Sequence, residues 1–218
     1  MNTTMPLYAP LVPDNKYDTV FEQTFAGNQI TVTLRPVSLP GDWPHMGKWL
    51  FREFMPRSRG SFSPPDHLPE KYLRETFSTM LQCDFAQPFI GLLNEQPGFL
   101  IEICDGEKHC DGLSTAPHIY ENGDHAIRVV LSPTVINNRK WSEYALFSSL
   151  GYFFSHLPIQ RIVWELHERD KHYINLANQL GFKTSNEHDW PGIHVYLYPR
   201  EKFTRFSGAL HQQIQKLP

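Results

Sequence analysis

Apolar and polar positions alternate along the chain in a pattern that predicts an ordered series of strands and helices. Residues 19–37 alternate on both sides of residues 26–28, which is typical of a β-hairpin. Two prolines in residues 40–44 interrupt the second strand. Apolar residues then recur at helical spacing, which predicts two helices. Their apolar stripes are Met46, Trp49, Leu50 and Phe54, and then Tyr72, Leu73, Thr76, Phe77, Met80 and Leu81.

The remainder of the chain alternates strands with helices. Residues 88–104 read as two strands around a short turn at residues 94–97. Asp170 is placed to cap the last helix and Gly181 to end it. This order predicts an α+β domain built on a mixed sheet. The later elements are a strand at 124–133, a helix from 138 to about 156, a strand at 160–166, a helix at 169–182 and a strand at 192–199.

Composition narrows the class of protein. The chain has 218 residues, 40% hydrophobic and 13% aromatic, which suits one globular domain with a substantial core. We expect this domain at residues 19–205, with an N-terminal extension at 1–18 and a C-terminal tail at 206–218. The formal net charge of −3 provides no basic field for nucleic acid or an anionic membrane. No apolar run approaches the ~20 residues of a membrane span.

The cysteines and the N-terminal sequence indicate the cellular compartment of the protein, and the cysteines and histidines indicate whether it binds a metal. Residues 1–18 lack the basic and apolar segments of a secretory signal. Cys83, Cys104 and Cys110 form no CxxC pair and no disulfide framework, so we expect a cytoplasmic protein. His109 adjoins Cys110, but no second pair stands at ligand spacing, and no metal site is predicted.

Two stretches are candidates for function. Residues 55–69 form a long loop rich in Ser, Pro and Arg, and a loop of that length is often functional. The pattern leaves open whether this loop is a lid or a scaffold. Residues 129–147, VVLSPTVINNRKWSEYALF, pass from a buried strand through a polar corner into an aromatic-rich helix. An α/β protein can bind an anion at such a corner, although residues 137–142 contain no glycine.

The order of elements resembles the GNAT acyltransferases. The similar branch is that of siderophore biosynthesis, which includes the aerobactin N-hydroxylysine acetyltransferase, and the aminoglycoside 6′-acetyltransferases are more distantly similar. The resemblance covers residues 19–203 and implies a central mixed, mostly antiparallel sheet flanked by helices. It rests on QPFIGLLNEQPGFLIEI with Glu102, on YENGDHAIRVVLSP led by Asp124, and on RIVWELHERDKHYINLANQLGFKTSNEHD.

The resemblance implies a site for acetyl-CoA or another acyl-CoA as co-substrate. Two neighbouring parallel strands, 126–132 and 161–166, would splay apart to admit its pantetheine arm. Backbone groups of Val129, Val130 and Leu131 would bind this arm. The pyrophosphate would lie at the N-terminus of the following helix. The residues at that corner are Asn138, Arg139, Lys140, Trp141 and Ser142.

This corner departs from the glycine-bearing turn of the family. Glycine lets the backbone approach phosphate closely. A helix N-terminus nevertheless presents N–H groups whatever its side chains, and Arg139 and Lys140 can add charge-assisted contacts. The alternative is structural: Arg139 and Lys140 are solvated charges, and Trp141 packs onto the core.

Four residues are candidates for catalysis. The resemblance places a catalytic histidine at the position of Arg128, and an arginine stays protonated and cannot act as a base. His167 stands where some members use an aspartate, and it could be the base while Arg128 binds a carboxylate of the acyl group or acceptor. Glu102 could face the acceptor amine. His125 lies three residues before Arg128, so alternation places it on the other face.

Each of these residues also has a structural interpretation. Arg128 could pair with Glu102 or Glu165 across neighbouring strands, and His167 could be an exposed strand-end residue. The reaction tolerates a weak base, because a hydroxylamine nitrogen is mostly neutral at pH 7. The protein must then mainly orient the nucleophile and bind the oxyanion through a backbone N–H near Val129–Leu131.

The resemblance therefore implies an acyl-CoA-dependent N-acyltransferase. Its acceptor would be a small hydroxylamine, an N-hydroxylated diamine or amino acid, converted to a hydroxamate in siderophore biosynthesis and iron acquisition. The enzyme itself would need no metal, and a homodimer is compatible with the sequence. One alternative is an acetyltransferase for another amine, such as an aminoglycoside or a polyamine. Another is a degenerate, non-catalytic domain that binds acyl-CoA or a partner.

Overall fold

The computed structural model describes residues 18–25, 27, 29–54, 70–106, 120–185 and 191–205. They form one eight-stranded sheet with the order β1-β2-β3-β4-β5-β6-β8-β7. The strands are β1 (Phe21–Phe25), β2 (Ile30–Pro36), β3 (Ala86–Leu93), β4 (Gln96–Asp105), β5 (Asp124–Leu131), β6 (Arg161–His167), β7 (Lys183–Thr184) and β8 (Ile193–Pro199). The helices are α1 (Leu39–Phe54), α2 (Glu70–Met80), α3 (Pro133–Ile136), α4 (Arg139–His156) and α5 (Lys171–Leu180).

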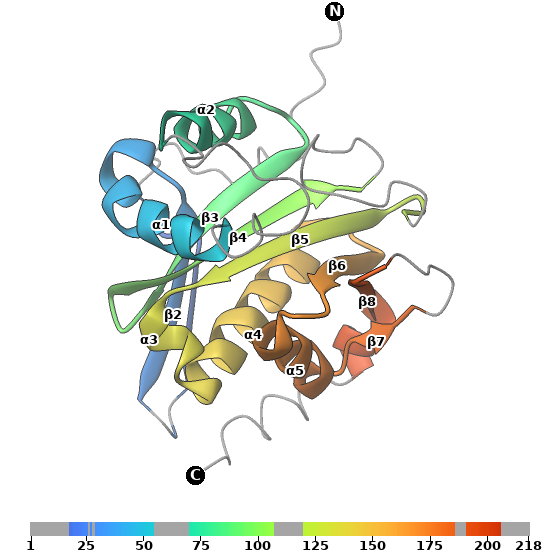
Figure 1. Cartoon of the computed structure of the whole chain (residues 1–218). Helices are drawn as coiled ribbons and strands as arrows, with labels where there is room; N and C mark the ends of the chain where they lie inside the picture. The colour runs from blue at the N-terminus through green and yellow to red at the C-terminus, as the bar shows by residue number, and fades with distance from the viewer. Residues whose placement is uncertain are drawn as a thin grey trace, which may run out of the picture.

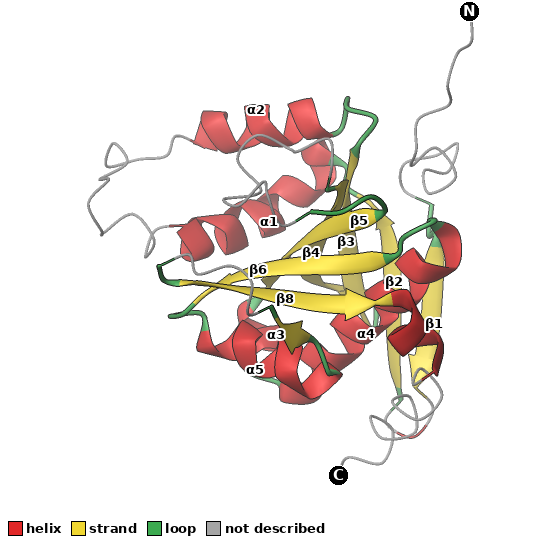
Figure 2. Cartoon of the chain, turned by 90° about the vertical axis from the view of Figure 1, so that its right-hand side faces the viewer, coloured by secondary structure: helices red, strands yellow, loops and turns green. Residues whose placement is uncertain are grey.

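The helices cover the sheet in two layers (Figures 1 and 2). Helices α1 and α2 lie on one face, and α4 and α5 lie on the other. Side chains of β5 alternate between these layers, since Ile127, Val129 and Leu131 join the core under α4 and α5. Val130 joins the smaller core under α1 and α2. This alternation decides which side chains of β5 can share a site.

The sheet is antiparallel except between β5 and β6. These two strands pair in parallel at three positions only, from Asp124↔Arg161 to Ala126↔Val163. Beyond Ala126 they diverge, while β5 remains paired with β4 as far as Leu131. The expected mixed, mostly antiparallel sheet is confirmed, and so is the splay between these two strands.

Helix α1 begins earlier than the sequence predicts. The two prolines of residues 40–44 lie inside its first turns instead of in a break before it. Pro40 stands where a helix needs no backbone N–H. Asp42 then fixes the helix start, because its carboxylate accepts the Ser38 N–H and binds the Arg35 guanidinium. A short helix, α3, also separates β5 from α4 and was not expected.

Turns and caps mostly follow the sequence. The β3–β4 turn has Asn94 and Glu95 in left-handed conformation, at φ of 47° and 67°. Gly181 ends α5 with φ of 88°, as predicted. Asp170 is the N-cap residue of α5, but its side chain makes no capping hydrogen bond. On β3, a Cβ at Gly91 would lie 2.0 Å from the Phe99 ring, so only glycine fits beside this aromatic residue.

Some expectations lie outside the described residues. These are residues 1–17 of the extension predicted at 1–18, the tail at 206–218, the loop at 55–69, and His109 with Cys110. Within the described residues, no helix has both the length and the apolar character needed to cross a bilayer.

Candidate functional site

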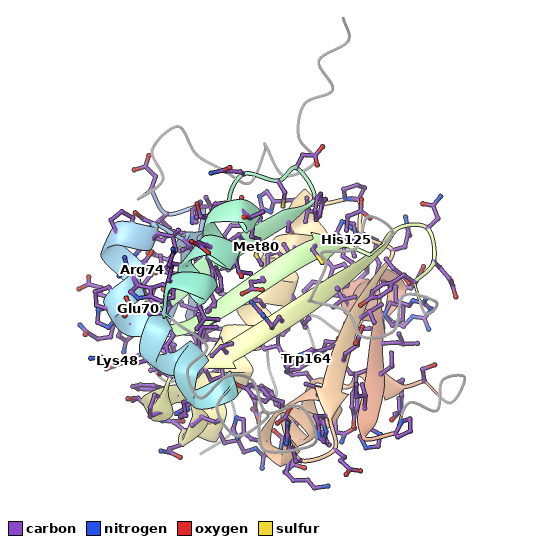
Figure 3. The ribbon with its side chains drawn as sticks, turned by 45° about the horizontal axis from the view of Figure 1, so that its top comes forward. Lys48, Glu70, Arg74, Met80, His125 and Trp164 are labelled. Atoms are coloured by element: carbon purple, nitrogen blue, oxygen red, sulfur yellow. The ribbon has the colours of Figure 1, made fainter. Side chains whose placement is uncertain are left out.

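The divergence of β5 and β6 opens a cavity in the sheet. Its volume is about 90 Å³. Figure 3 shows Trp164 between the two strands, and His125 toward the end where they still pair. The residues lining it are Glu102, Cys104, Tyr120, Ala126, Ile127, Arg128, Val129, Trp164, Glu165, Leu166 and Tyr173. The cavity thus joins the layer under α1 and α2 with the α5 side of the sheet.

The free edge of β5 faces this gap. The Ser132 N–H donates to Gly98 of β4, so by alternation the backbone groups of Leu131 and Val129 point away from β4 and toward β6. The Leu131 N–H donates to the Tyr173 hydroxyl at 3.1 Å. The Leu131 carbonyl accepts from the Arg52 guanidinium at 2.5 Å. Backbone groups that a neighbouring strand would otherwise bind are therefore accessible to side chains or to a ligand.

Glu102 and Arg128 form an ion pair on the α1–α2 side of the gap. They stand directly opposite each other on β4 and β5. The Arg128 Nη2 donates to the Glu102 Oε1 at 2.6 Å, and the two side chains are 23% and 1% exposed. The guanidinium also lies over the Phe77 ring at 5.7 Å. The structure thus brings together two of the four catalytic candidates.

The second oxygen of Glu102 has no hydrogen-bond partner among the described residues, although it is buried. Burial raises the pKa of Glu102, and the Arg128 charge and hydrogen bond only partly oppose this effect. A carboxylate with a raised pKa is a stronger base than an exposed one. Glu102 therefore offers one positioned, basic oxygen at the wall of the cavity.

Four further side chains line the cavity: Tyr120, Glu165, Trp164 and Tyr173. The Tyr120 hydroxyl donates to the Glu165 carboxylate at 2.8 Å. Trp164 is buried and packs edge-on against the Tyr173 ring, with 5.9 Å between ring centroids. This packing fixes the Tyr173 hydroxyl beside the end of β5, where it reaches the gap.

Two histidines lie away from the Glu102–Arg128 pair. Side chains alternate between the two faces of β5, so His125 lies on the same face as Ile127 and Val129. Arg128 lies on the opposite face. Burial lowers the pKa of His125, partly offset by the Gly123 carbonyl and by nearby aspartates. His167 ends β6, where its Nδ1 accepts the Arg169 N–H at 3.3 Å. Neither histidine lines the cavity.

The N-terminus of α4 is built by a side-chain cap. The Asn138 side chain accepts the Trp141 N–H, so one helix N–H is already bound. The Arg139 guanidinium pairs with Glu143 at 2.9 Å and is 66% exposed. Lys140 is half-buried and Trp141 packs against the main core. Ser142 is buried, and its hydroxyl donates to the Val135 carbonyl.

His172, on α5, joins this corner to the end of β5. Its Nε2 lies 3.3 Å from the Ser142 hydroxyl. Burial and the nearby Arg52 charge lower the pKa of His172. The corner therefore receives an arginine from α1 and a histidine from α5 in addition to its own residues.

Sequence reasoning missed Tyr173 and Arg52. Tyr173 lies in the helix predicted at residues 169–182 and Arg52 in the first predicted helix, and neither was singled out as a site residue. A hydroxyl on the buried face of a helix and a cation among the apolar residues of another helix are the signals that could have found them. Among the described residues, no group of three or more His, Cys, Asp or Glu side chains could hold a metal ion.

Comparison with known families identifies the domain. The family model described as "Acetyltransferase (GNAT) domain" matches residues 42–190, more than half of the chain. No curated protein matches the sequence at a significant level. The family match includes α2 to α5 and every residue that lines the cavity.

Solved structures share the fold at low sequence identity. An uncharacterized protein from Bacillus halodurans has 16% identity over 92% of this chain and 100% of its own, with a TM-score of 0.69. The aminoglycoside acetyltransferase AAC(6')-Ib, solved with coenzyme A, has 19% identity over 81% and 99%, with a TM-score of 0.63. A chimera of the Vibrio cholerae spermidine N-acetyltransferase has 12% identity over 79% and 98%, with a TM-score of 0.54.

Proposed function

Because the chain belongs to the GNAT family of acyl-CoA-dependent acetyltransferases, we propose that it acylates an N-hydroxylated amine to a hydroxamate. The acceptor would be an N-hydroxylated diamine or amino acid, and the product a building block of a siderophore. The observation that carries this proposal is the cavity between β5 and β6, which contains one basic carboxylate oxygen and no histidine.

The gap has the features that a pantetheine arm requires. Val129 directs its C=O group toward it, and an amide N–H of an extended arm can pair with this group as a strand would. The N-terminus of α4 follows at the end of β5, where a helix favours negative charge. These residues fit acyl-CoA as co-substrate, and no metal is required for acyl transfer.

Glu102 is proposed as the base. The acceptor nitrogen would donate its proton to the Glu102 Oε2 as the new N–C bond forms and the C–S bond of the thioester breaks. Arg128 holds the other oxygen of the same carboxylate, so its role is to position Glu102. His167 and His125 line no part of this cavity, and the proposal therefore assigns neither of them the proton transfer.

Val129 and Tyr173 would serve the thioester. The Val129 N–H points into the gap and can donate to the carbonyl oxygen as it gains charge. The Tyr173 hydroxyl accepts the Leu131 N–H and, like any hydroxyl, can also donate a proton. It is placed to protonate the departing thiolate, which completes the proton balance of the reaction.

The modest basicity of the cavity supports an N-hydroxylated acceptor. A primary amine such as a lysine side chain has a pKa near ~10.4 and is protonated at neutral pH. A hydroxylamine nitrogen is mostly neutral, so one carboxylate suffices to remove the proton that leaves during attack. The two carboxylates of the cavity wall are already engaged, Glu102 by Arg128 and Glu165 by Tyr120. A polycation would require more carboxylates than this wall provides.

Thiol release tests the proposal directly. The purified protein is supplied with acetyl-, succinyl- and other acyl-CoAs, in combination with N-hydroxylysine, N-hydroxyornithine or N-hydroxycadaverine. Lysine, ornithine and cadaverine are the matched controls, since each differs only by the hydroxyl on nitrogen. We expect turnover with the N-hydroxylated acceptors and at least tenfold lower turnover with the parent amines.

The other outcomes decide between the alternatives. Turnover with kanamycin or spermidine but not with hydroxylamines would assign the protein to amine acetylation. Thermal stabilisation by acyl-CoA without turnover on any acceptor would indicate a non-catalytic binding domain. Neither result is compatible with the proposed acceptor class.

A further inference from the structure

Both backbone groups of Leu131 that face the gap are bound by side chains. The N–H donates to Tyr173 and the C=O accepts from Arg52. Buried backbone groups need partners, and here they lack a neighbouring strand to supply them. The two side chains therefore stand where a ligand's amide groups would otherwise bind.

Arg52 comes to this point from the opposite layer of the molecule. It lies in the last turn of α1, a helix that covers the other face of the sheet from α4 and α5. Its guanidinium forms no ion pair with a described carboxylate. A half-buried cation without such a partner is suited to an anionic ligand.

His172 approaches the same point from α5. The Ser142 hydroxyl donates its hydrogen to a backbone carbonyl, so the His172 Nε2 must be the donor in the 3.3 Å contact between them. Burial and the nearby Arg52 charge lower the pKa of His172, which favours the uncharged ring. Ser142 belongs to the first turn of α4. Arg52 and His172 thus converge on the mouth of the gap beside a helix N-terminus.

We propose that Arg52 binds the diphosphate of acyl-CoA and takes over the task of the missing glycine turn, while His172 holds the first turn of α4 in place through Ser142. The inference rests on the proposed use of acyl-CoA and adds two residues outside the corner itself. A glycine turn binds phosphate through backbone groups, whereas this corner has a capped N-terminus and an exposed Arg139 already paired with Glu143. The Arg52 side chain from α1 supplies the donors instead, and His172 from α5 positions the corner through Ser142.

The arrangement also implies an exchange of partners. When Arg52 moves to the diphosphate, the Leu131 carbonyl becomes available to accept an amide N–H of the pantetheine arm. The guanidinium carries five donors and can bind two phosphate oxygens side by side. The cofactor therefore replaces, at Leu131, the hydrogen bond that Arg52 gives up.

The test compares two ligands that differ in the diphosphate part. Acetyl-CoA carries it, and acetyl-pantetheine does not. Dissociation constants of both are measured for the wild type, Arg52→Ala, Arg52→Lys and His172→Phe by calorimetry or, for millimolar binding, by NMR titration. Lys48→Ala is the matched control, because Lys48 is an exposed cation one turn earlier on α1 and lies away from Trp164 (Figure 3).

We expect Arg52→Ala to weaken acetyl-CoA binding about 10- to 100-fold, as for loss of a charge-assisted hydrogen bond. Acetyl-pantetheine binding should change less than twofold. Arg52→Lys should recover part of the loss, since it keeps the charge but not the fork of donors. His172→Phe should weaken acetyl-CoA binding several-fold, and Lys48→Ala should have no effect.

Two results would overturn the inference. One is unchanged acetyl-CoA affinity in Arg52→Ala. The other is equal weakening of both ligands, which would assign Arg52 to the pantetheine channel or to folding. Thermal unfolding of each variant distinguishes a folding defect. If the wild type binds neither ligand, the proposed function itself fails, and that result is separate from any effect of Arg52.

Discussion

Two buried carboxylates on the central strands are paired with arginines in different ways. Asp124 accepts two hydrogen bonds from Arg161 and a third from the Glu121 N–H. Glu102 accepts one hydrogen bond from Arg128, and its second oxygen has no described partner. Asp124 lies where β5 and β6 are paired, and Glu102 lies beside the gap where they have separated.

This difference in hydrogen bonding indicates that Asp124 and Arg161 form a structural ion pair, and that Glu102 and Arg128 form a functional one. A buried carboxylate whose two oxygens both accept hydrogen bonds has little capacity left to bind a ligand. A buried charge with an unsatisfied oxygen is costly to the fold and is retained where chemistry uses it. Each of the following substitutions tests whether the two pairs differ in this way.

Glu102→Gln should produce the largest effect on activity. The amide keeps the size of the side chain but cannot accept a proton, so we expect kcat to fall about 100- to 10,000-fold. The wild type should lose activity as the pH falls through the raised pKa of Glu102, because the base must be deprotonated. Steady-state thiol release across pH measures both effects. Glu95→Gln, on the exposed β3–β4 turn, is the control.

The same variant should not be less stable than the wild type. Burial raises the pKa of Glu102 in the folded state, so its stabilising contribution is complete below the ordinary value of 4.5 and is lost as the pH rises through the raised value. Above the raised pKa the charged form therefore costs stability, and glutamine removes this cost while its amide oxygen can still accept from Arg128. A large loss of stability with activity intact would show that Glu102 is a structural residue.

Asp124→Asn should have the opposite effects, with reduced stability and nearly unchanged activity. It removes the charge that Arg161 contacts through two nitrogens, and we expect a loss of about 2–4 kcal/mol in the free energy of unfolding. Urea denaturation measures this loss, with the exposed Asp84→Asn as the control. Activity per folded molecule should be close to that of the wild type. A fully stable but inactive variant would contradict the comparison.

Tyr173→Phe tests whether the Tyr173 hydroxyl in the gap acts as a proton donor. It removes one hydroxyl and leaves the packing against Trp164 intact, so the fold should persist. We expect kcat to fall about tenfold to a hundredfold, because the departing thiolate loses its proton donor. The loss should be smaller with a thioester whose thiol is more acidic. An equal loss with both thioesters would indicate that Tyr173 only supports Leu131.

The smallest expected effect concerns His125, at the paired end of β5. Burial lowers its pKa below the ordinary value of 6.5, so the unfolded chain binds the proton more readily. Stability should therefore fall as the pH drops below about 6.5, with a slope of at most about 1.4 kcal/mol per pH unit for one proton. His125→Phe should flatten this slope, and the part due to His172 should remain. An unchanged slope would show that His125 does not titrate on unfolding.

The fold could be predicted from the sequence because periodicity and turn residues agree over most of the chain. Alternation along β5 alone predicts that Arg128 and His125 lie on opposite faces of the sheet, as they do. The start of α1 could not be predicted, because it depends on Arg35 and Ser38 binding Asp42 from outside the helix. The pattern of apolar and polar residues within a helix does not reveal contacts with residues outside it.

The site was only partly predictable for a similar reason. Glu102 and Arg128 carry charges on buried strands, a local signal that sequence reasoning can detect. Tyr173 and Arg52 look ordinary in their own helices and acquire a role only where three layers meet at Leu131. The siderophore branch suggested by the resemblance has no support from the comparisons beyond the GNAT family itself.

The short pairing between β5 and β6 affects which part of the molecule can unfold locally. Only three residue pairs join β6, β8 and β7 to the rest of the sheet, so this C-terminal portion can exchange its amide hydrogens as a separate cooperative unit. A ligand arm lying along the gap would act as a substitute strand and connect the two portions. Its arrival should slow deuterium uptake in Arg161–His167 and Ile193–Pro199 more than in β2 and β3, so that the sheet becomes continuous only while its substrate is bound.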